Sequence, residues 1–247
     1  RRALAKAVSF FMEKQPETIV AITGTNGKTS VATFCRQLWN EAGIEAINIG
    51  TTGVEGSWST PLNYTTPDPV KLHQVLHKAA SEGITHVAME ASSHGLDQRR
   101  LDGVEIKTTA FTNFSRDHLD YHVSIKNYFN AKKGLFERLC PKEKVGVFNI
   151  DNEEIKDLAD WYSLNNHVLT VGHDKIADLV ILQQKFRPKS QDIRFSFRDK
   201  IYQKSINLIG AFQAENLLMA AILVIASGQK ESVIFENLEN IKPARGR

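Results

Sequence analysis

A glycine-bearing loop between a predicted strand and a predicted helix constrains the fold of this 247-residue chain more than any other feature. Residues 18–23 are rich in β-branched side chains, which favour a strand, and residues 29–42 carry apolar side chains at helical spacing up to Gly43. The loop between them reads Thr23-Gly24-Thr25-Asn26-Gly27-Lys28-Thr29. A strand, a glycine-rich turn and a helix in this order indicate an α/β domain.

The same loop has the composition of a phosphate-binding site. Its glycines let successive backbone N–H groups face an anion, and the helix N-terminus adds a partial positive charge. Lys28 is then placed to reach the β- and γ-phosphates of a nucleotide, and the Thr29 hydroxyl is placed to bind Mg²⁺. Ile22 stands where the usual P-loop pattern has its first glycine, so a glycine-rich turn that binds nothing is the alternative.

The pattern downstream predicts a doubly wound α/β fold with a mostly parallel sheet and helices on both faces. Asp68 can cap a helix that has Pro69 in its first turn and ends near Glu82. A further helix is expected over residues 124–139. The strands expected in the parallel sheet are residues 18–23, 44–49, 84–90, 106–112 and 144–150.

The C-terminal half predicts an antiparallel β addition to that sheet. Polar turns separate its four short apolar segments, residues 168–171, 177–182, 193–197 and 201–206. Two helices are expected after them, over residues 211–227 and 230–240. At the other end of the chain, apolar side chains at helical spacing predict a helix over residues 1–14 that packs on the elements after it.

Composition excludes several classes of protein. The chain has 31 lysines and arginines against 28 aspartates and glutamates, and a net charge of +3 is too small to indicate nucleic-acid binding. No apolar run reaches the roughly 18 residues of a membrane helix, so no membrane insertion is expected. Cys35 and Cys140 match no disulfide or metal spacing, which favours a reducing compartment and a cytoplasmic protein.

The predicted strand over residues 84–90 ends at an ionisable side chain, Glu90. Ligand sites of open α/β sheets lie at the carboxyl ends of the strands, so this carboxylate is placed to bind Mg²⁺ beside a nucleotide phosphate. Ser92, Ser93 and His94 come next, but the G-x-S-x-G turn of a serine hydrolase is absent. A polar loop without a ligand is the alternative.

A third polar segment, residues 112–122, also follows a predicted strand, and it carries five ionisable side chains within seven positions. His118 and His122 are four residues apart, which would suit zinc on a helix, but no glutamate adjoins the first histidine. The nearby phosphate loop favours Mg²⁺ with oxygen ligands and one imidazole. Taken alone, residues 112–122 could also be a solvated charged loop. Taken alone, Lys132 and Lys133 have the pattern of a surface pair on an amphipathic helix.

Together these motifs resemble the Mur ligases, the ATP-dependent amide-forming enzymes of peptidoglycan synthesis, and their relatives the folylpolyglutamate synthases. The loop over residues 24–29, which lacks the first glycine of the P-loop pattern, is similar to the phosphate loop of these families. Within them, residues 65–67, 89–96 and 115–122 resemble the MurE type. The resemblance extends from about Ile19 to the C-terminus, and its motifs are specific in combination.

The resemblance implies a role for each matching residue. It makes Lys28, Lys132 and His118 catalytic, with Lys132 as a carbamate formed from CO₂, because a carbamate can bind Mg²⁺ and an ammonium cannot. The implied metal ligands are Thr29, Glu90, His118 and the carbamate of Lys132. The implied ATP-binding residues are Gly24, Thr25, Asn26, Gly27, Lys28, Thr29, Ser30 and, beside the adenine, Asn216. The implied substrate-binding residues are Thr65, Thr66, Ser92, Gln98 and Arg100.

The resemblance also implies a reaction and a domain organisation. ATP would activate the D-Glu carboxylate of UDP-MurNAc-L-Ala-D-Glu as an acyl phosphate, which a diamino acid, meso-diaminopimelate or L-lysine, would convert to an amide. The chain begins at Arg1 without a methionine, and it is expected to be the central ATP-binding domain of a monomeric enzyme, inactive without an N-terminal UDP-binding and a C-terminal amino-acid-binding domain. The alternatives are a folylpolyglutamate synthase, another Mur ligase or a P-loop kinase of a small molecule.

Overall fold

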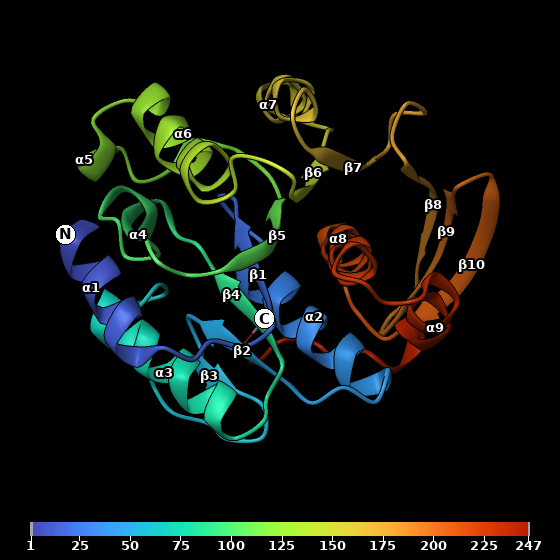
Figure 1. The fold of residues 1–247 in the computed structure, drawn as a ribbon. Helices are drawn as coiled ribbons and strands as arrows, with labels where there is room; N and C mark the ends of the chain where they lie inside the picture. Colours follow the sequence, from blue (N-terminus) through green and yellow to red (C-terminus); the bar gives the residue numbers. More distant parts are fainter. Residues whose placement is uncertain (1, 247) are drawn as a thin grey trace.

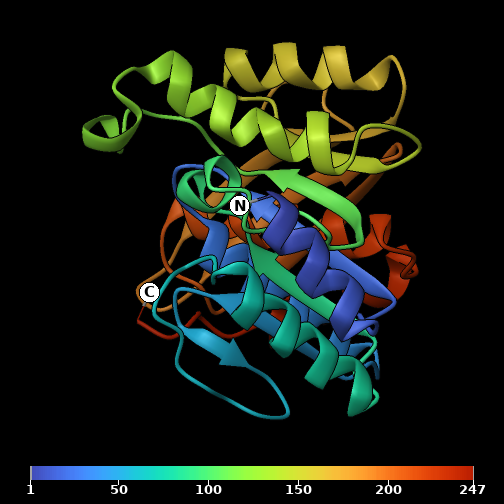
Figure 2. The ribbon, with the colours of Figure 1, turned by 60° about the vertical axis from the view of Figure 1, so that its left-hand side comes forward.

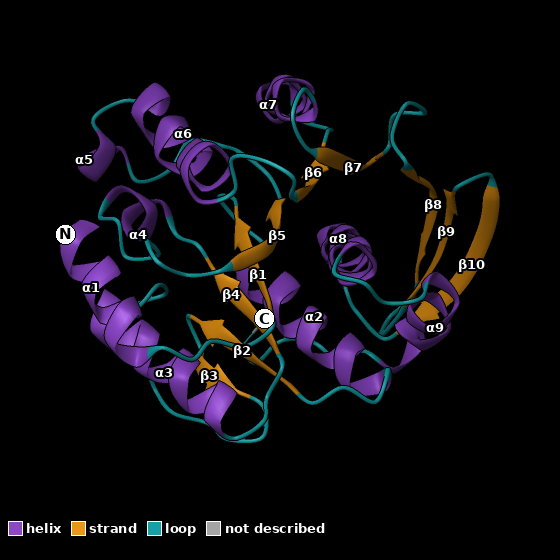
Figure 3. Ribbon diagram, in the orientation of Figure 1, coloured by secondary structure: helices purple, strands orange, loops and turns teal. Residues whose placement is uncertain are grey.

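The predicted parallel sheet forms the centre of the computed structural model, which describes residues 2–246 (Figure 3). In space, the strand order is β10-β9-β8-β7-β6-β5-β1-β4-β2-β3. The strands, in chain order, are β1 (Thr18–Thr23), β2 (Ala46–Gly50), β3 (Gly53–Glu55), β4 (His86–Glu90), β5 (Ile106–Phe111), β6 (Val145–Asn149), β7 (His167–Gly172), β8 (Leu179–Phe186), β9 (Gln191–Phe197) and β10 (Lys200–Ile206).

The central strand β1 explains where a ligand can bind. All six of its residues are buried, as expected for a parallel strand covered on both faces, and it pairs in parallel with β4 on one side and β5 on the other. The chain builds outward from β1 to β2 first and later crosses to β5, so the strand order reverses beside β1. Such a switch point opens a crevice at the carboxyl ends of the strands.

The C-terminal half differs from the prediction in one respect. The segment over residues 168–171 does not belong to the antiparallel addition, because β7 pairs in parallel with β6 and β8 begins in parallel with β7. In the described C-terminal half, β8, β9 and β10 are the strands joined antiparallel, and at the opposite edge of the sheet β3 pairs antiparallel with β2. A parallel pair requires a crossover, and α7 (Glu153–Ser163), which we did not predict, supplies it between β6 and β7.

Helices cover both faces of the sheet, as predicted. The sheet curves around α2 (Lys28–Glu41), α8 (Ala211–Ala226) and α9 (Glu231–Glu236) (Figure 1). On its outer face lie α1 (Arg2–Met12), α3 (Pro69–Ser81), α4 (Ser93–Asp97), α5 (Leu119–His122), α6 (Ile125–Gly134) and α7. Figure 2 shows α6 and α7 close together on this side. Each face therefore buries its own apolar cluster.

The helix boundaries confirm most of the predicted local signals. Asp68 caps α3, because its carboxylate accepts hydrogen bonds from the backbone N–H groups of Val70 and Lys71. The helix predicted over residues 124–139 is α6 followed by a π-helical segment, Leu135–Leu139. The helix predicted over residues 230–240 is α9 followed by a 3₁₀ turn, Asn237–Asn240.

The N-terminal helix α1 packs less than we predicted. It lies against α3, but Ala5 is its buried residue, and Phe10 and Phe11 are 79% and 80% exposed. Cys35 and Cys140 are both buried free thiols, in agreement with their spacing. No helix within residues 2–246 has the length and apolarity needed to cross a membrane.

Candidate active site

The phosphate loop lies where β1 ends and α2 begins, and its two glycines have backbones that other residues rarely adopt. Gly24 has φ 147°, and a Cβ there would lie 2.0 Å from Thr112 Oγ1. Gly27, with φ 84°, immediately precedes α2, and no side chain caps this helix end. A Cβ at Gly27 would lie 2.3 Å from Asn216 Oδ1. The loop is therefore wedged between the segment after β5 and the start of α8, with free helix N–H groups beside it.

The segment after β5 holds the phosphate loop by several hydrogen bonds. The Asn113 side chain binds both backbone groups of Asn26: its Oδ1 accepts from the N–H at 2.8 Å, and its Nδ2 donates to the carbonyl at 3.1 Å. Thr112 Oγ1 donates to the same carbonyl at 2.6 Å, and Thr25 N–H donates to the Asn113 carbonyl at 2.9 Å. Sequence reasoning gave Asn113 no role, because its partner is 87 residues away.

Lys28 and Lys132 meet at the carbonyl of Gly24. Lys28 Nζ donates to this oxygen at 2.9 Å and to the Thr25 carbonyl at 2.7 Å, and Lys132 Nζ donates to it at 2.6 Å. Lys132 is 1% exposed, and its Nζ lies 4.4 Å from the centre of the Tyr128 ring. Burial, together with the charge of Lys28, lowers the pKa of Lys132 to about 6. Lys132 is thus a buried site group rather than one of a surface pair.

Glu90, at the end of β4, is 2% exposed and has few partners for a carboxylate. Its Oε1 accepts from Thr51 N–H at 2.8 Å, and its Oε2 accepts from Thr51 Oγ1 at 3.3 Å. Burial raises its pKa, against the opposing effects of these hydrogen bonds, of the Lys28 charge and of the Thr29 hydroxyl. Gly50 makes room for the carboxylate, since a Cβ there would lie 2.0 Å from Glu90 Oε1.

The donor set fits a magnesium ion shared with a nucleotide better than a metal held by protein alone. Within residues 2–246, no three His, Cys, Asp or Glu side chains gather to form a metal site. Glu90, Thr29 and His118 instead border one cavity. One or two protein oxygens completed by phosphate oxygens and water are the usual ligands of Mg²⁺. His118 and His122 do not provide a helical zinc pair, because His118 precedes α5 with φ 50°.

The residues expected to bind substrate lie beside Glu90 and are bonded to one another. Thr66 Oγ1 donates to the Glu90 carbonyl at 2.8 Å and accepts from Ser92 N–H at 2.9 Å. Arg100 Nη1 donates to the Thr66 carbonyl at 2.7 Å, and the hydroxyls of Thr65 and Thr51 are 3.0 Å apart. These contacts hold Thr65, Thr66, Ser92 and Arg100 in one rim around the buried carboxylate of Glu90.

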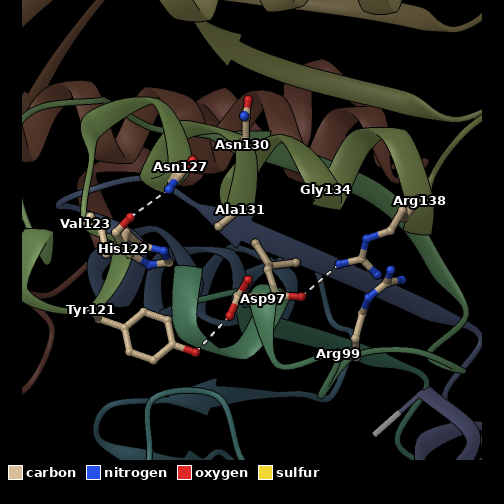
Figure 4. Close-up of a pocket in the computed structure, with 11 residues that line it drawn as sticks. Asp97, Arg99, Tyr121, His122, Val123, Asn127, Asn130, Ala131, Gly134 and Arg138 are labelled. Carbon is tan, nitrogen blue, oxygen red and sulfur yellow. Dashed lines mark hydrogen bonds between the residues drawn. The ribbon is translucent and has the colours of Figure 1, made fainter.

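Tyr121 extends this network to the loop that carries His118. Arg100 donates from Nε and Nη2 to Gln98 Oε1, at 3.1 and 2.7 Å, and Gln98 Nε2 donates to the Tyr121 hydroxyl at 3.2 Å. That hydroxyl donates in turn to Asp97 Oδ2 at 2.8 Å (Figure 4). The Tyr121 ring also lies 4.2 Å from that of His94, which packs on His118 at 4.9 Å. Sequence reasoning did not single out Tyr121 or Asp97.

One cavity of about 1130 Å³ brings nearly all the predicted site residues together. Gly24 is the exception, because it is buried behind the loop and its carbonyl holds the two lysines. The predicted residues that line the cavity are Thr25, Asn26, Gly27, Lys28, Thr29, Ser30, Thr65, Thr66, Glu90, Ser92, Gln98, Arg100, His118, Lys132 and Asn216. Lining residues that we did not predict include Thr51, Asn113, Phe212 and Gln213.

Comparisons with known proteins agree with this arrangement. The family profile described as "Mur ligase middle domain" matches residues 22–224. Proteins named UDP-N-acetylmuramoyl-L-alanyl-D-glutamate--2,6-diaminopimelate ligase are similar over the whole chain, at 47% identity in Rhizobium meliloti (strain 1021) and 45% in Brucella melitensis biotype 1. The chain spans about half the length of these curated relatives, 51% of each.

Solved structures share the fold. A structure titled as a UDP-N-acetylmuramoyl-L-alanyl-D-glutamate--2,6-diaminopimelate ligase superposes with a TM-score of 0.91 at 29% identity, over 100% of this chain and 51% of that one. A Mycobacterium tuberculosis folylpolyglutamate synthase complexed with ADP superposes with a TM-score of 0.78 at 16% identity, over 98% of this chain and 62% of that one. At that identity, the second likeness concerns the fold alone.

Proposed function

Because this chain belongs to the Mur ligase middle-domain family, we propose that it is the ATP-binding central domain of a ligase that joins 2,6-diaminopimelate to UDP-MurNAc-L-Ala-D-Glu. The observation that carries the proposal is the single cavity in which the phosphate loop, Glu90, His118 and Lys132 face the rim of Thr66 and Arg100. The names of the relatives at 47% and 45% identity favour diaminopimelate over lysine as the added amino acid.

The phosphate loop and Lys28 would bind the nucleotide. Backbone N–H groups at the start of α2 would face the β- and γ-phosphates, and Asn216 on α8, which borders the same cavity, would contact the adenine. Thr29, Glu90, His118 and a carbamylated Lys132 are the residues that would hold Mg²⁺, which offsets phosphate charge during transfer. These residues lie on α2, β4, the loop before α5 and α6, and all four border one cavity.

Arg100 and the hydroxyls of Thr65, Thr66 and Ser92 would hold the D-Glu carboxylate in line with the γ-phosphorus. A carboxylate oxygen bonds to that phosphorus as the bond to the ADP oxygen breaks, which yields an acyl phosphate and ADP. The amine of diaminopimelate then bonds to the acyl carbon, loses a proton and expels phosphate. Lys28 stabilises the charge that builds up on the transferred phosphoryl group.

Lys132 is suited to carbamate formation because its amine is neutral near pH 7. Burial and Lys28 hold its pKa at about 6, and the neutral amine is the form that adds to CO₂ and releases one proton. The product carries a negative charge beside the Lys28 cation, and the attraction between the two stabilises the carbamate. A carbamate also supplies oxygen ligands that an ammonium cannot supply.

Paired lysine variants test the proposal in the full-length enzyme. Lys132→Ala is expected to abolish formation of the diaminopimelate product, and added CO₂ should not restore it. Lys133→Ala is the matched control, since Lys133 is bonded to Glu137 on the outside of α6, and it should remain active. Loss of product in Lys133→Ala with retention in Lys132→Ala would contradict the proposal.

The remaining parts of the proposal concern the protein as a whole. The enzyme would be a cytoplasmic monomer in which the N- and C-terminal domains bind the UDP group and the incoming amino acid. A folylpolyglutamate synthase has the same fold, so product formation must be compared with UDP-MurNAc-dipeptide and with a folate as acceptors of the amino acid. Phosphate release that needs no amine would instead indicate a kinase or a nucleotide hydrolase.

A further inference from the structure

A second cavity lies between α4, α5 and α6 and contains none of the residues proposed above for catalysis (Figure 4). Its volume is about 570 Å³, within the usual range for sites that bind small molecules. Tyr121 borders it from the side of the active site, because the same hydroxyl contacts Gln98 in the first cavity and Asp97 in the second.

Polar groups without a protein partner border this second cavity. Within the described chain, Asn130 makes no side-chain hydrogen bond, and Asp97 uses only Oδ2, which accepts from Tyr121. His122 is 6% exposed, and its Nε2 is buried without a hydrogen-bond partner. Of these three residues, only His122 is buried, whereas Asn130 and Asp97 are exposed. A buried polar atom without a partner is uncommon and calls for a ligand or water.

Two residues that border the cavity also have strained backbones. Arg99 has φ 61° and follows Gln98, the C-cap residue of α4, at a position where glycine is the usual choice. Val123 has φ 67° and ψ −37°, although β-branched residues rarely adopt positive φ. Strain of this kind costs about 1–3 kcal/mol per residue and clusters at binding sites. Two such residues on one cavity are an observation independent of its polar groups.

Charge indicates the class of ligand. Arg99 and Arg138 share one carboxylate, that of Asp102, at 3.5 and 2.8 Å, so one positive charge is left in excess on their side. Asp97 provides a negative charge beside Tyr121, away from the guanidinium groups (Figure 4). Asp97 would repel a ligand that carries only a negative charge, and the arginines would repel a ligand that carries only a positive charge. A molecule with both charges satisfies both sides.

We propose that this cavity binds a small zwitterion such as a free amino acid, with its carboxylate on Arg99 and Arg138 and its ammonium group on Asp97. Arg138 is fixed for this role, because it also donates to the Leu96 carbonyl at 2.8 Å.

Calorimetric titration of the 247-residue chain with L-lysine tests the proposal. The wild-type chain should bind one lysine, and Arg99→Gly should weaken binding by about ten-fold or more through loss of a charge-assisted contact. Arg198→Gly is the matched control: Arg198 also has a positive φ, 49°, and lies in the turn between β9 and β10, so this variant should bind as the wild type does. Both substitutions remove one charge and relieve one strained backbone.

Other outcomes would overturn the proposal. Failure of the wild-type chain to bind lysine at millimolar concentration, or equal binding by Arg99→Gly, would exclude the site. Loss of binding in Arg100→Ala with retention in Arg99→Gly would place the lysine in the catalytic cavity. Acetate that binds as tightly as lysine would indicate a site for anions alone. Thermal melting controls for folding, and Arg99→Gly should melt no lower than the wild type.

Discussion

Val123 shows how much conformational strain a single residue holds at the border of the site. The N–H of Ser124 donates to the carbonyl of His122 at 2.7 Å, which makes Val123 the centre of a tight three-residue turn with positive φ. Its side chain is 83% exposed and so gains little from packing. The turn joins the segment that carries His118 to α6, which carries Lys132. The strain therefore lies between two groups proposed to bind the metal.

Val123→Gly should stabilise the chain by about 1 kcal/mol, because relief of the backbone strain exceeds the extra freedom that glycine gains on unfolding. Urea denaturation measures this change. Val123→Ala is the control, since alanine keeps the Cβ that makes positive φ unfavourable. The interpretation fails if the glycine variant is no more stable than the alanine variant.

Tyr121→Phe removes one hydroxyl that holds Gln98 and, through it, Arg100. In the full-length enzyme, the KM for UDP-MurNAc-dipeptide should rise by about two- to ten-fold, the range expected for one lost hydrogen bond. The KM for ATP should not change, because the Tyr121 hydroxyl contacts Gln98 and Asp97 rather than residues of the phosphate loop. Equal increases in both KM values would show a general disturbance rather than a positioning role.

The sequence predicted the site residues near the ends of strands, but it did not predict the residues whose hydrogen bonds hold the site in place. Lys28 begins the helix that follows β1, and Glu90 is the last residue of β4. Parallel strands bring their carboxyl ends to one edge of the sheet. Asn113 and Tyr121 act through partners 87 and 24 residues away, so no local pattern indicates their contacts. Lys132 had the pattern of a surface lysine, and only the family resemblance indicated otherwise.

At the scale of elements, the phosphate loop depends on the segment after β5. Asn113→Ala should weaken ADP binding by about ten-fold, because both backbone groups of Asn26 lose a partner and the loop is no longer held for the phosphates. Calorimetric titration of the chain with Mg²⁺–ADP measures the effect. Asn165→Ala, outside the cavity, is the control and should bind like the wild type. Unchanged affinity in Asn113→Ala would exclude the positioning role.

The element that we failed to predict, α7, explains the wrong assignment of β7. Its buried residues Ile155, Leu158 and Ala159 have helical spacing, but two glutamates in its first turn gave the segment a polar character. These acidic side chains suit a helix N-terminus, and Asn152 caps it. Without a crossover helix, β7 could be joined to its neighbours only as an antiparallel strand. The direction of a strand thus depended on the recognition of a helix.

At the scale of the whole molecule, Lys132 makes folding depend on pH. Its pKa is about 6 in the folded chain and near 10.5 unfolded, so between these values the unfolded chain holds the extra proton and stability rises with pH. Burial lowers the pKa of His73, His86, His94 and His122, so their contribution is nearly complete by about pH 8. Burial raises the pKa of Cys35, which destabilises folding only above about pH 9.

Lys132→Met should therefore flatten the rise in stability between pH 7 and 8.5 in buffer free of CO₂. The wild-type free energy of unfolding should increase by at most about 1.4 kcal/mol per pH unit in this interval. Urea denaturation at both pH values gives the slope. A variant that keeps the wild-type slope would show that another group is responsible.

The position of α8 has a consequence for the nascent chain. This helix is almost wholly buried against α2 and also carries Asn216 to the phosphate loop, where Gly27 lies against it. During synthesis, the phosphate loop leaves the ribosome long before α8 does. Until α8 packs, α2 has an uncovered apolar face and the nucleotide cavity lacks one wall. The proposed nucleotide site is therefore complete only after α8 has been synthesised and has packed on α2.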